Sequence, residues 1–201
     1  MPRFVPLDLL PALQCAISQE LRYSSWARRR DCLAVAIGLH GLRVGEVVRA
    51  RFEHLWIAGR ILHVPPFKRG HARAVPLHHS LVTALLDWRG DCSCPWLLFT
   101  RTGAKVHRTQ FERAATRITR QVLGEPLKFH ALRHTFATRV YHDTNDPLLV
   151  KQLLGHRSLK STEVYAESLA SVPDACLIQL DAAETKNESM TQRLKLYCPA
   201  G

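Results

Sequence analysis

Residues 130 to 138 read His-Ala-Leu-Arg-His-Thr-Phe-Ala-Thr. The wider segment from His130 to Tyr141 suits a helix. On a helix, His130 and Arg133 share one face because they are three positions apart. His130 and His134 are four apart, which by itself would suit metal ligands or an ordinary helix surface. The segment therefore places a titratable group beside a cation, in a pattern specific enough to anchor the rest of the chain.

The sequence on both sides of this segment is predicted to be mostly helical. Apolar residues recur at helical spacing in several further stretches, and Gly41 is expected to end the second of them, as glycine often does at a helix C-terminus. The expected helices cover residues 7–21, 28–39, 44–51, 80 onward, 108–123, 147–154 and 161–169.

One region breaks the helical pattern. Residues 55–57 and 60–64 flank the turn Ala58-Gly59 and predict a β-hairpin. Residues 72–77 can add a third strand after a basic loop that contains Lys68. The predicted fold class is therefore α+β, a mostly helical domain with a small three-stranded antiparallel sheet.

The composition points to a polyanionic partner. The 201 residues carry 28 Lys and Arg against 17 Asp and Glu, a net charge of +11. Such an excess favours nucleic acid, because each neutralised phosphate releases condensed counterions. Charge alone does not distinguish DNA from RNA or from an acidic membrane. No segment has the apolar length of a membrane span, and the N-terminus does not resemble a secretory signal. The six cysteines are expected to be reduced in a cytoplasmic protein, and Cys92-Ser-Cys94 lacks the spacing of a zinc site.

Four fragments, taken in order, resemble the sequence boxes of the tyrosine recombinase (phage integrase) family. The segment of residues 130–138 is the third box. The others are Gly41-Leu-Arg-Val-Gly-Glu-Val47, Lys68 ahead of Arg73-Ala-Val-Pro-Leu77, and Leu153-Leu-Gly-His156 with Tyr165 behind it. The resemblance covers about residues 7 to 170, and its order along the chain leaves little room for coincidence.

The resemblance implies a catalytic role for six residues. The phosphate-clamping arginines would be Arg43 and Arg133, the general acid–base group His130, and the nucleophile Tyr165. Lys68 would protonate the leaving oxygen and His156 would hydrogen-bond the scissile phosphate. The predicted catalytic set is Arg43, Lys68, His130, Arg133, His156 and Tyr165.

These residue types suit phosphoryl transfer. A guanidinium donates two parallel hydrogen bonds to the non-bridging oxygens of a phosphodiester. A phenol with a pKa of about 10 must lose its proton as it attacks. The resemblance implies a covalent 3′-phosphotyrosine and a free 5′-hydroxyl, so rejoining needs no ATP. No cofactor is expected, since the chain has neither a P-loop glycine pattern nor a carboxylate cluster for two Mg²⁺ ions.

Each residue also has an ordinary structural explanation when taken alone. Arg43 could answer the dipole of the preceding helix, and Lys68 could sit in a solvated turn. His156 could be a helix cap, and Tyr165 a core aromatic. The run Arg28 to Arg30 resembles a solvated helix start that could also touch the DNA backbone. The order of the boxes favours the catalytic explanation for the six.

The main departure from the family is at the front of the chain; in addition, Phe129 replaces the proline that is frequent before the histidine of the third box. Only 42 residues precede Arg43, whereas most of the family carry a separate DNA-clamping domain there. The chain is therefore expected to be a catalytic domain without an N-terminal core-binding domain, similar in size to the short DNA-inversion recombinases, or equally a fragment of a longer protein. Residues 1–171 are expected to form the catalytic domain, and residues 172–201 a tail whose segment 175–180 could dock on a neighbouring protomer or fold onto its own domain. The expected partner is double-stranded DNA, bound as a tetramer on paired sites by a protein that is monomeric when free.

Two other functions remain open from the sequence. A type IB topoisomerase shares this chemistry but only relaxes supercoils. A non-enzymatic DNA-binding regulator would need basic helices but no nucleophile. Site-specific recombination, for integration, excision or inversion of DNA, is the predicted function.

Overall fold

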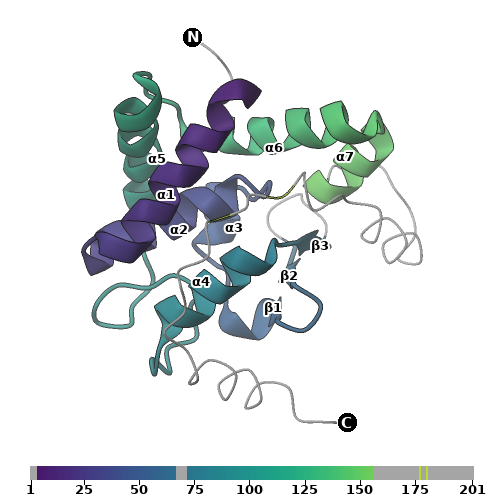
Figure 1. Cartoon of the computed structure of the whole chain (residues 1–201). Helices are drawn as coiled ribbons and strands as arrows, with labels where there is room; N and C mark the ends of the chain where they lie inside the picture. Colours follow the sequence, from purple (N-terminus) through teal and green to yellow (C-terminus); the bar gives the residue numbers. More distant parts are fainter. Residues whose placement is uncertain (1–3, 67–71, 156–176, 178–179, 181–201) are drawn as a thin grey trace.

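A computed structural model describes residues 4–66 and 72–155, together with Leu177 and Leu180 (Figure 1). The strands are β1 (Leu55–Trp56), β2 (Ile61–Val64) and β3 (Arg73–Pro76). The helices are η1 (Leu7–Leu9), α1 (Leu10–Tyr23), α2 (Trp26–Gly38), α3 (Val44–Val47), η2 (Phe52–His54), α4 (His79–Arg89), α5 (Arg108–Leu123), α6 (Phe129–Thr144) and α7 (Pro147–Leu154). The predicted α+β fold, mostly helical with a small antiparallel sheet, is confirmed.

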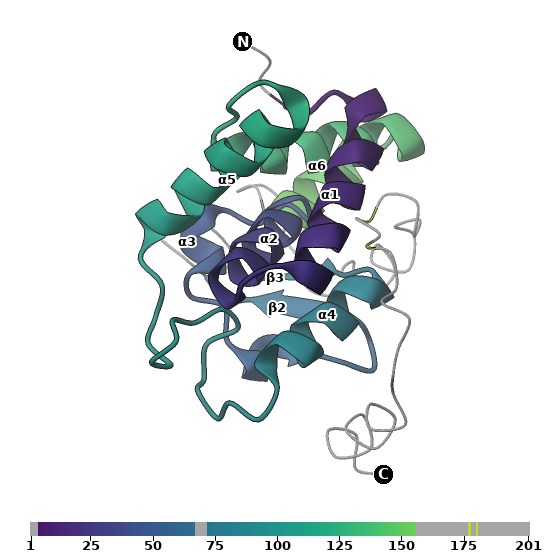
Figure 2. The same cartoon turned by 60° about the vertical axis from the view of Figure 1, so that its left-hand side comes forward.

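Helix α2 is the centre of the domain. Every residue from Arg30 to Gly38 is buried, because α2 contacts α1, α4, α5 and α6. Gly38 permits a close approach of α6, since a Cβ there would lie 2.8 Å from the Phe129 ring at the start of that helix. Figure 2 shows α2 with α5 and α6 on one side and the sheet and α4 on the other. The segment that follows α2, which contains Arg43, is thereby fixed in the middle of the molecule.

The sheet has the order β1-β2-β3 and both pairs are antiparallel. The tight turn between β1 and β2 differs from the predicted one in its backbone. Arg60, with φ +55°, takes the left-handed conformation. Gly59 is required for another reason: a Cβ there would lie 2.3 Å from the Trp56 ring. The sheet sets the start of β3, and hence Arg73, near α7.

The ends of the later helices follow simple capping chemistry. The Asp146 carboxylate accepts hydrogen bonds from the backbone N–H groups of Leu148 and Leu149 and caps α7, as expected for an aspartate before a helix. Gly155 ends α7 with φ +65°, the left-handed conformation that favours glycine. Helices α5 and α7 have the predicted bounds, whereas α3 is only four residues long.

The arginine run at the start of α2 is only partly exposed to solvent. Arg30 is buried between the Trp26 and Phe111 rings and pairs with Asp31 at 2.7 Å. Arg28 pairs with Glu20 at 2.7 Å, and Arg29 pairs with Asp87. The predicted solvated start is therefore wrong for Arg30, which is buried beside Phe111 of α5. Arg28 and Arg29 are half-buried and pair with carboxylates on other helices, which sequence spacing does not reveal.

Two residues of the C-terminal tail pack on the domain. Leu177 is buried among Phe136, Val140 and the apolar side of α7. Leu180 joins the main core, and its backbone N–H donates to the Ser80 hydroxyl at 2.8 Å. The predicted helix of residues 161–169 lies outside the described residues. No helix in the described part of the chain is long and apolar enough to cross a membrane.

Candidate active site

Three of the six predicted catalytic residues lie in the described part of the chain. Arg43 is the residue immediately before α3. His130 lies in the first turn of α6, and Arg133 follows one turn later. Lys68, His156 and Tyr165 lie outside the described residues, so their roles remain predictions.

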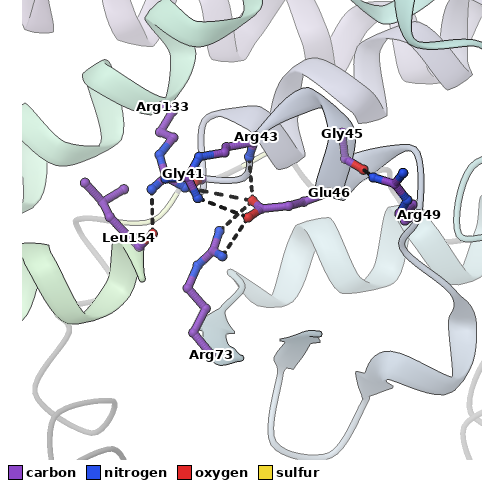
Figure 3. Close-up of polar contacts among 8 residues, drawn as sticks. All are labelled: Gly41, Arg43, Gly45, Glu46, Arg49, Arg73, Arg133 and Leu154. Atoms are coloured by element: carbon purple, nitrogen blue, oxygen red, sulfur yellow. Dashed lines mark hydrogen bonds and ion pairs between the residues drawn. The ribbon is translucent and has the colours of Figure 1, made fainter. Parts of the chain in front are cut away.

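The carboxylate of Glu46 brings the arginines of this region together (Figure 3). Arg73 binds it with both terminal nitrogens, at 2.9 and 2.7 Å. The backbone N–H of Arg43 donates to it at 2.7 Å, and the Arg43 guanidinium lies 3.3 Å away. Arg133 approaches the same carboxylate at 3.8 Å. Segments far apart in sequence therefore meet at one buried anion.

Arg133 is held from two sides by backbone carbonyls. Its Nη1 donates to the Gly41 carbonyl at 2.6 Å, and its Nη2 donates to the Leu154 carbonyl. Gly41 adopts φ +89°, and a Cβ there would lie 2.6 Å from the Phe136 ring. Glycine is therefore the residue that fits where this carbonyl is presented to Arg133. A guanidinium has five N–H donors, so Arg133 keeps further donors for a bound anion.

The charges of the cluster shift each other's titration. Burial opposes ionisation of Glu46, but its hydrogen bonds and the charges of Arg73 and Arg133 outweigh burial and hold its pKa below the usual value. Burial, with the charges of Arg73 and Arg43, lowers the pKa of Arg133 to about 9. Glu46 is therefore ionised and Arg133 protonated at neutral pH.

His130 is an exposed histidine beside this cluster. Its ring lies 4.5 Å from the His134 ring, edge to face. Partial burial, followed by the charges of His134, Arg133 and Arg43, lowers the pKa of His130. A histidine with a pKa below its ordinary value of about 6.5 is mostly neutral at pH 7, so His130 can accept a proton.

Glu46 and Arg73 belong to two of the sequence boxes, but the sequence alone predicted no role for them. Their side chains are 3% and 1% exposed, respectively, whereas that of Arg43 is 38% exposed. The available signal was Glu46, three residues after Arg43, because a carboxylate next to an arginine in a buried stretch needs a cationic partner. The sequence could not show that this partner is Arg73, on a strand 27 positions away.

The cluster is suited to an anion with spread charge. Three guanidinium groups surround one carboxylate, which leaves an excess of two positive charges. Since Arg73 occupies both oxygens of Glu46, Arg43 and Arg133 keep donors for another anion. Fixed donors in a partly buried site stabilise charge that develops on a phosphoryl group.

Comparison with known proteins gives consistent matches. Residues 15–171 match the model of the phage integrase family. The chain is 28% identical to the tyrosine recombinase XerC of Pseudomonas entomophila over 159 residues, 74% of this chain and 52% of that protein. It is 26% identical to the type 1 fimbriae regulatory protein FimB of Escherichia coli K12 over 151 residues, 72% of this chain and 76% of FimB. The chain thus spans about half the length of the XerC relative.

A solved structure shares the fold. The XerH site-specific recombinase, in a pre-cleavage complex with its difH substrate, matches with a TM-score of 0.63 and 23% identity. The match covers 86% of this chain and 53% of XerH.

Proposed function

Because the chain belongs to the phage integrase family, we propose that it is a site-specific DNA recombinase that cuts and rejoins DNA through Tyr165. One observation carries the proposal. Arg43 and Arg133, predicted as phosphate ligands, lie within 4 Å of the same carboxylate although 90 positions separate them. The charges of both arginines also lower the pKa of His130, the predicted acid–base residue.

The proposed reaction begins with the scissile phosphate in this cluster. Arg43 and Arg133 bind its non-bridging oxygens and stabilise the negative charge that grows on them in the transition state. Neutral His130 accepts the phenolic proton as the Tyr165 oxygen attacks phosphorus. The P–O5′ bond breaks and Lys68 protonates the leaving oxygen. The products are a 3′-phosphotyrosine and a 5′-hydroxyl.

The role of His156 in this scheme is a hydrogen bond to the phosphate. Gly155 and Leu154, directly before His156, contact Arg73 and Arg133. Rejoining reverses the reaction with a new 5′-hydroxyl, and the energy of the phosphotyrosine bond drives it without ATP. The scheme requires no metal or organic cofactor.

The proposed partner is double-stranded DNA. The net charge of +11 favours such a partner, and the structurally similar XerH recombinase was solved in complex with its difH substrate. Exposed cations also line helix α5, which contacts α3 next to Arg43. They are Arg108, Arg113, Arg117 and Arg120, of which Arg108 also pairs with Glu112 and Arg117 with Asp31. We further propose a tetramer on paired DNA sites, and action on DNA in the cytoplasm.

The test starts with the DNA that flanks the encoding gene, as a source of candidate target sequences. Protein and DNA fragments are mixed and stopped with SDS, and the DNA ends that remain on the protein are sequenced. The proposal expects one recurrent sequence, joined through its 3′ end, with a 5′-hydroxyl that polynucleotide kinase can label.

Two copies of the captured sequence are then placed on a supercoiled plasmid. Deletion or inversion of the intervening DNA supports recombination. Relaxed topoisomers without rearrangement would make the protein a type IB topoisomerase. DNA binding with no covalent ends would make it a non-enzymatic regulator.

A further inference from the structure

Arg73 is a buried arginine that is not among the six predicted catalytic residues. It begins β3, and its side chain is 1% exposed. Both terminal nitrogens bind Glu46, at 2.9 and 2.7 Å. The guanidinium is therefore committed to a carboxylate and is not free to bind a phosphate with its two-pronged edge.

The guanidinium end of Arg73 acts on Arg43 through Glu46. The same carboxylate accepts the backbone N–H of Arg43 at 2.7 Å and lies 3.3 Å from its side chain (Figure 3). Because Arg73 fixes both oxygens of Glu46, the carboxylate cannot rotate, and the start of α3 is held in one position. The backbone from which the more exposed Arg43 side chain extends is thereby fixed.

The aliphatic stem of Arg73 acts on the end of α7. A Cβ built on Gly155 would lie 2.9 Å from the Arg73 Cδ, so this glycine packs directly against the stem. The preceding residue, Leu154, accepts a hydrogen bond from Arg133. One side chain therefore contacts the turn that Arg133 holds and the carboxylate that holds Arg43.

A purely structural ion pair is the competing explanation. Buried ion pairs are poor stabilisers, since burial of the two charges costs about as much as their attraction returns. The chain offers a matched pair for comparison. Arg30 and Asp31 are also buried, at 2.7 Å, but they lie in the N-terminal half of α2, among Trp26 and Phe111.

We propose that Arg73 is a positioning residue, which holds Arg43 through Glu46 and the Leu154–Gly155 turn through its stem, so that the two phosphate-binding arginines act together. This inference rests on the proposed function. Arg73 itself forms no bond to the reacting phosphate.

The test compares Arg73→Met and Arg73→Lys with wild type on the captured DNA sequence, in single-turnover cleavage with saturating enzyme. Each protein is assayed below its unfolding temperature, checked by circular dichroism. Arg73→Met should slow cleavage on the order of 10²-fold while DNA affinity changes by less than about threefold. Arg73→Lys keeps the charge but cannot bind Glu46 with two prongs, so it should also be slow.

A second substrate separates positioning from stability. A methylphosphonate at the scissile position replaces one charged oxygen with a methyl group, so the centre depends less on the two arginines. The rate deficit of Arg73→Met, relative to wild type, should shrink on this substrate, as should that of Arg43→Ala. The control Arg30→Met should lower the unfolding temperature without slowing cleavage by the folded protein.

The inference is overturned if folded Arg73→Met or Arg73→Lys cleaves at the wild-type rate, or if the deficit of Arg73→Met is unchanged on the methylphosphonate. If wild type itself forms no covalent complex, the proposed function fails first. The two failures are therefore distinguishable.

Discussion

Arg43 and Arg133 carry the same charge but are held differently, and this difference is testable. The Arg43 side chain is 38% exposed, whereas Arg133 is 3% exposed and binds the carbonyls of Gly41 and Leu154. Replacing either with Ala should slow cleavage on the order of 10²-fold, as for the loss of a preorganised donor. Only Arg133→Ala should also reduce stability, by about 1–3 kcal/mol, because two buried carbonyls lose their donor.

Single-turnover rates, DNA binding and urea unfolding measure these three effects. Equal losses of affinity and of cleavage rate would make the arginines ordinary phosphate contacts rather than transition-state ligands. An unchanged stability of Arg133→Ala would contradict the hydrogen bonds to Gly41 and Leu154.

His40 should make stability depend on pH. It is fully buried, its Nδ1 bonds the Ala36 carbonyl, and its Nε2 has no hydrogen-bond partner in the described part of the chain. Burial, and the charges of His78 and Arg139, lower its pKa to about 4. An unfolded histidine has a pKa of about 6.5. Between about pH 4 and pH 6.5, His40 is therefore mostly protonated in the unfolded chain and mostly neutral in the folded chain. Stability is therefore fully present above about pH 6.5 and falls towards pH 4.

Urea unfolding at pH 7 and pH 5 tests this dependence. Wild type should lose about 2 kcal/mol more than His40→Gln between these two values. The control His63→Gln, on the exposed face of β2, should behave as wild type. Equal losses for wild type and His40→Gln would show that His40 does not titrate as described.

Local sequence patterns predicted the bounds of helices and strands better than the contacts between residues far apart in the sequence. The bounds of α5 and α7 follow from their own capping residues and apolar spacing. The pairing of Glu46 with Arg73 depends instead on how β3 meets the segment after α2, which no local pattern encodes. For the same reason the sequence misjudged Arg30, whose burial between Trp26 and Phe111 comes from the packing of α5 on α2.

The packing of Leu177 on α6 and α7 predicts that this residue contributes to stability. The side chain is 2% exposed and packs against Phe136, Val140 and three leucines of α7. Leu177→Ala should therefore reduce the free energy of unfolding by about 2–5 kcal/mol. The control Leu148→Ala, at a leucine that is 58% exposed, should have little effect. A Leu177→Ala protein as stable as wild type would mean that the tail does not pack on its own domain in solution.

For the whole molecule, the basic surface predicts strongly salt-dependent binding to DNA. With about five phosphates neutralised, the slope of log K against log salt should be roughly −4.5. Affinity should then fall by between about two and three orders of magnitude from ~50 to ~200 mM salt. Fluorescence anisotropy with a labelled duplex measures the slope. A slope near zero would contradict a phosphate-dominated interface.

Tyr165 is proposed to become covalently joined to DNA, and trapping on a nicked duplex tests this directly. Wild type, Tyr165→Phe and Tyr141→Phe are incubated with a nicked suicide duplex carrying the captured sequence, and the adducts are resolved in SDS and digested for peptide mass spectrometry. We predict that wild type and Tyr141→Phe form an adduct whose nucleotide maps to Tyr165, while Tyr165→Phe binds the DNA and forms none. An adduct that persists in Tyr165→Phe, or that maps to Tyr141, would contradict the claim.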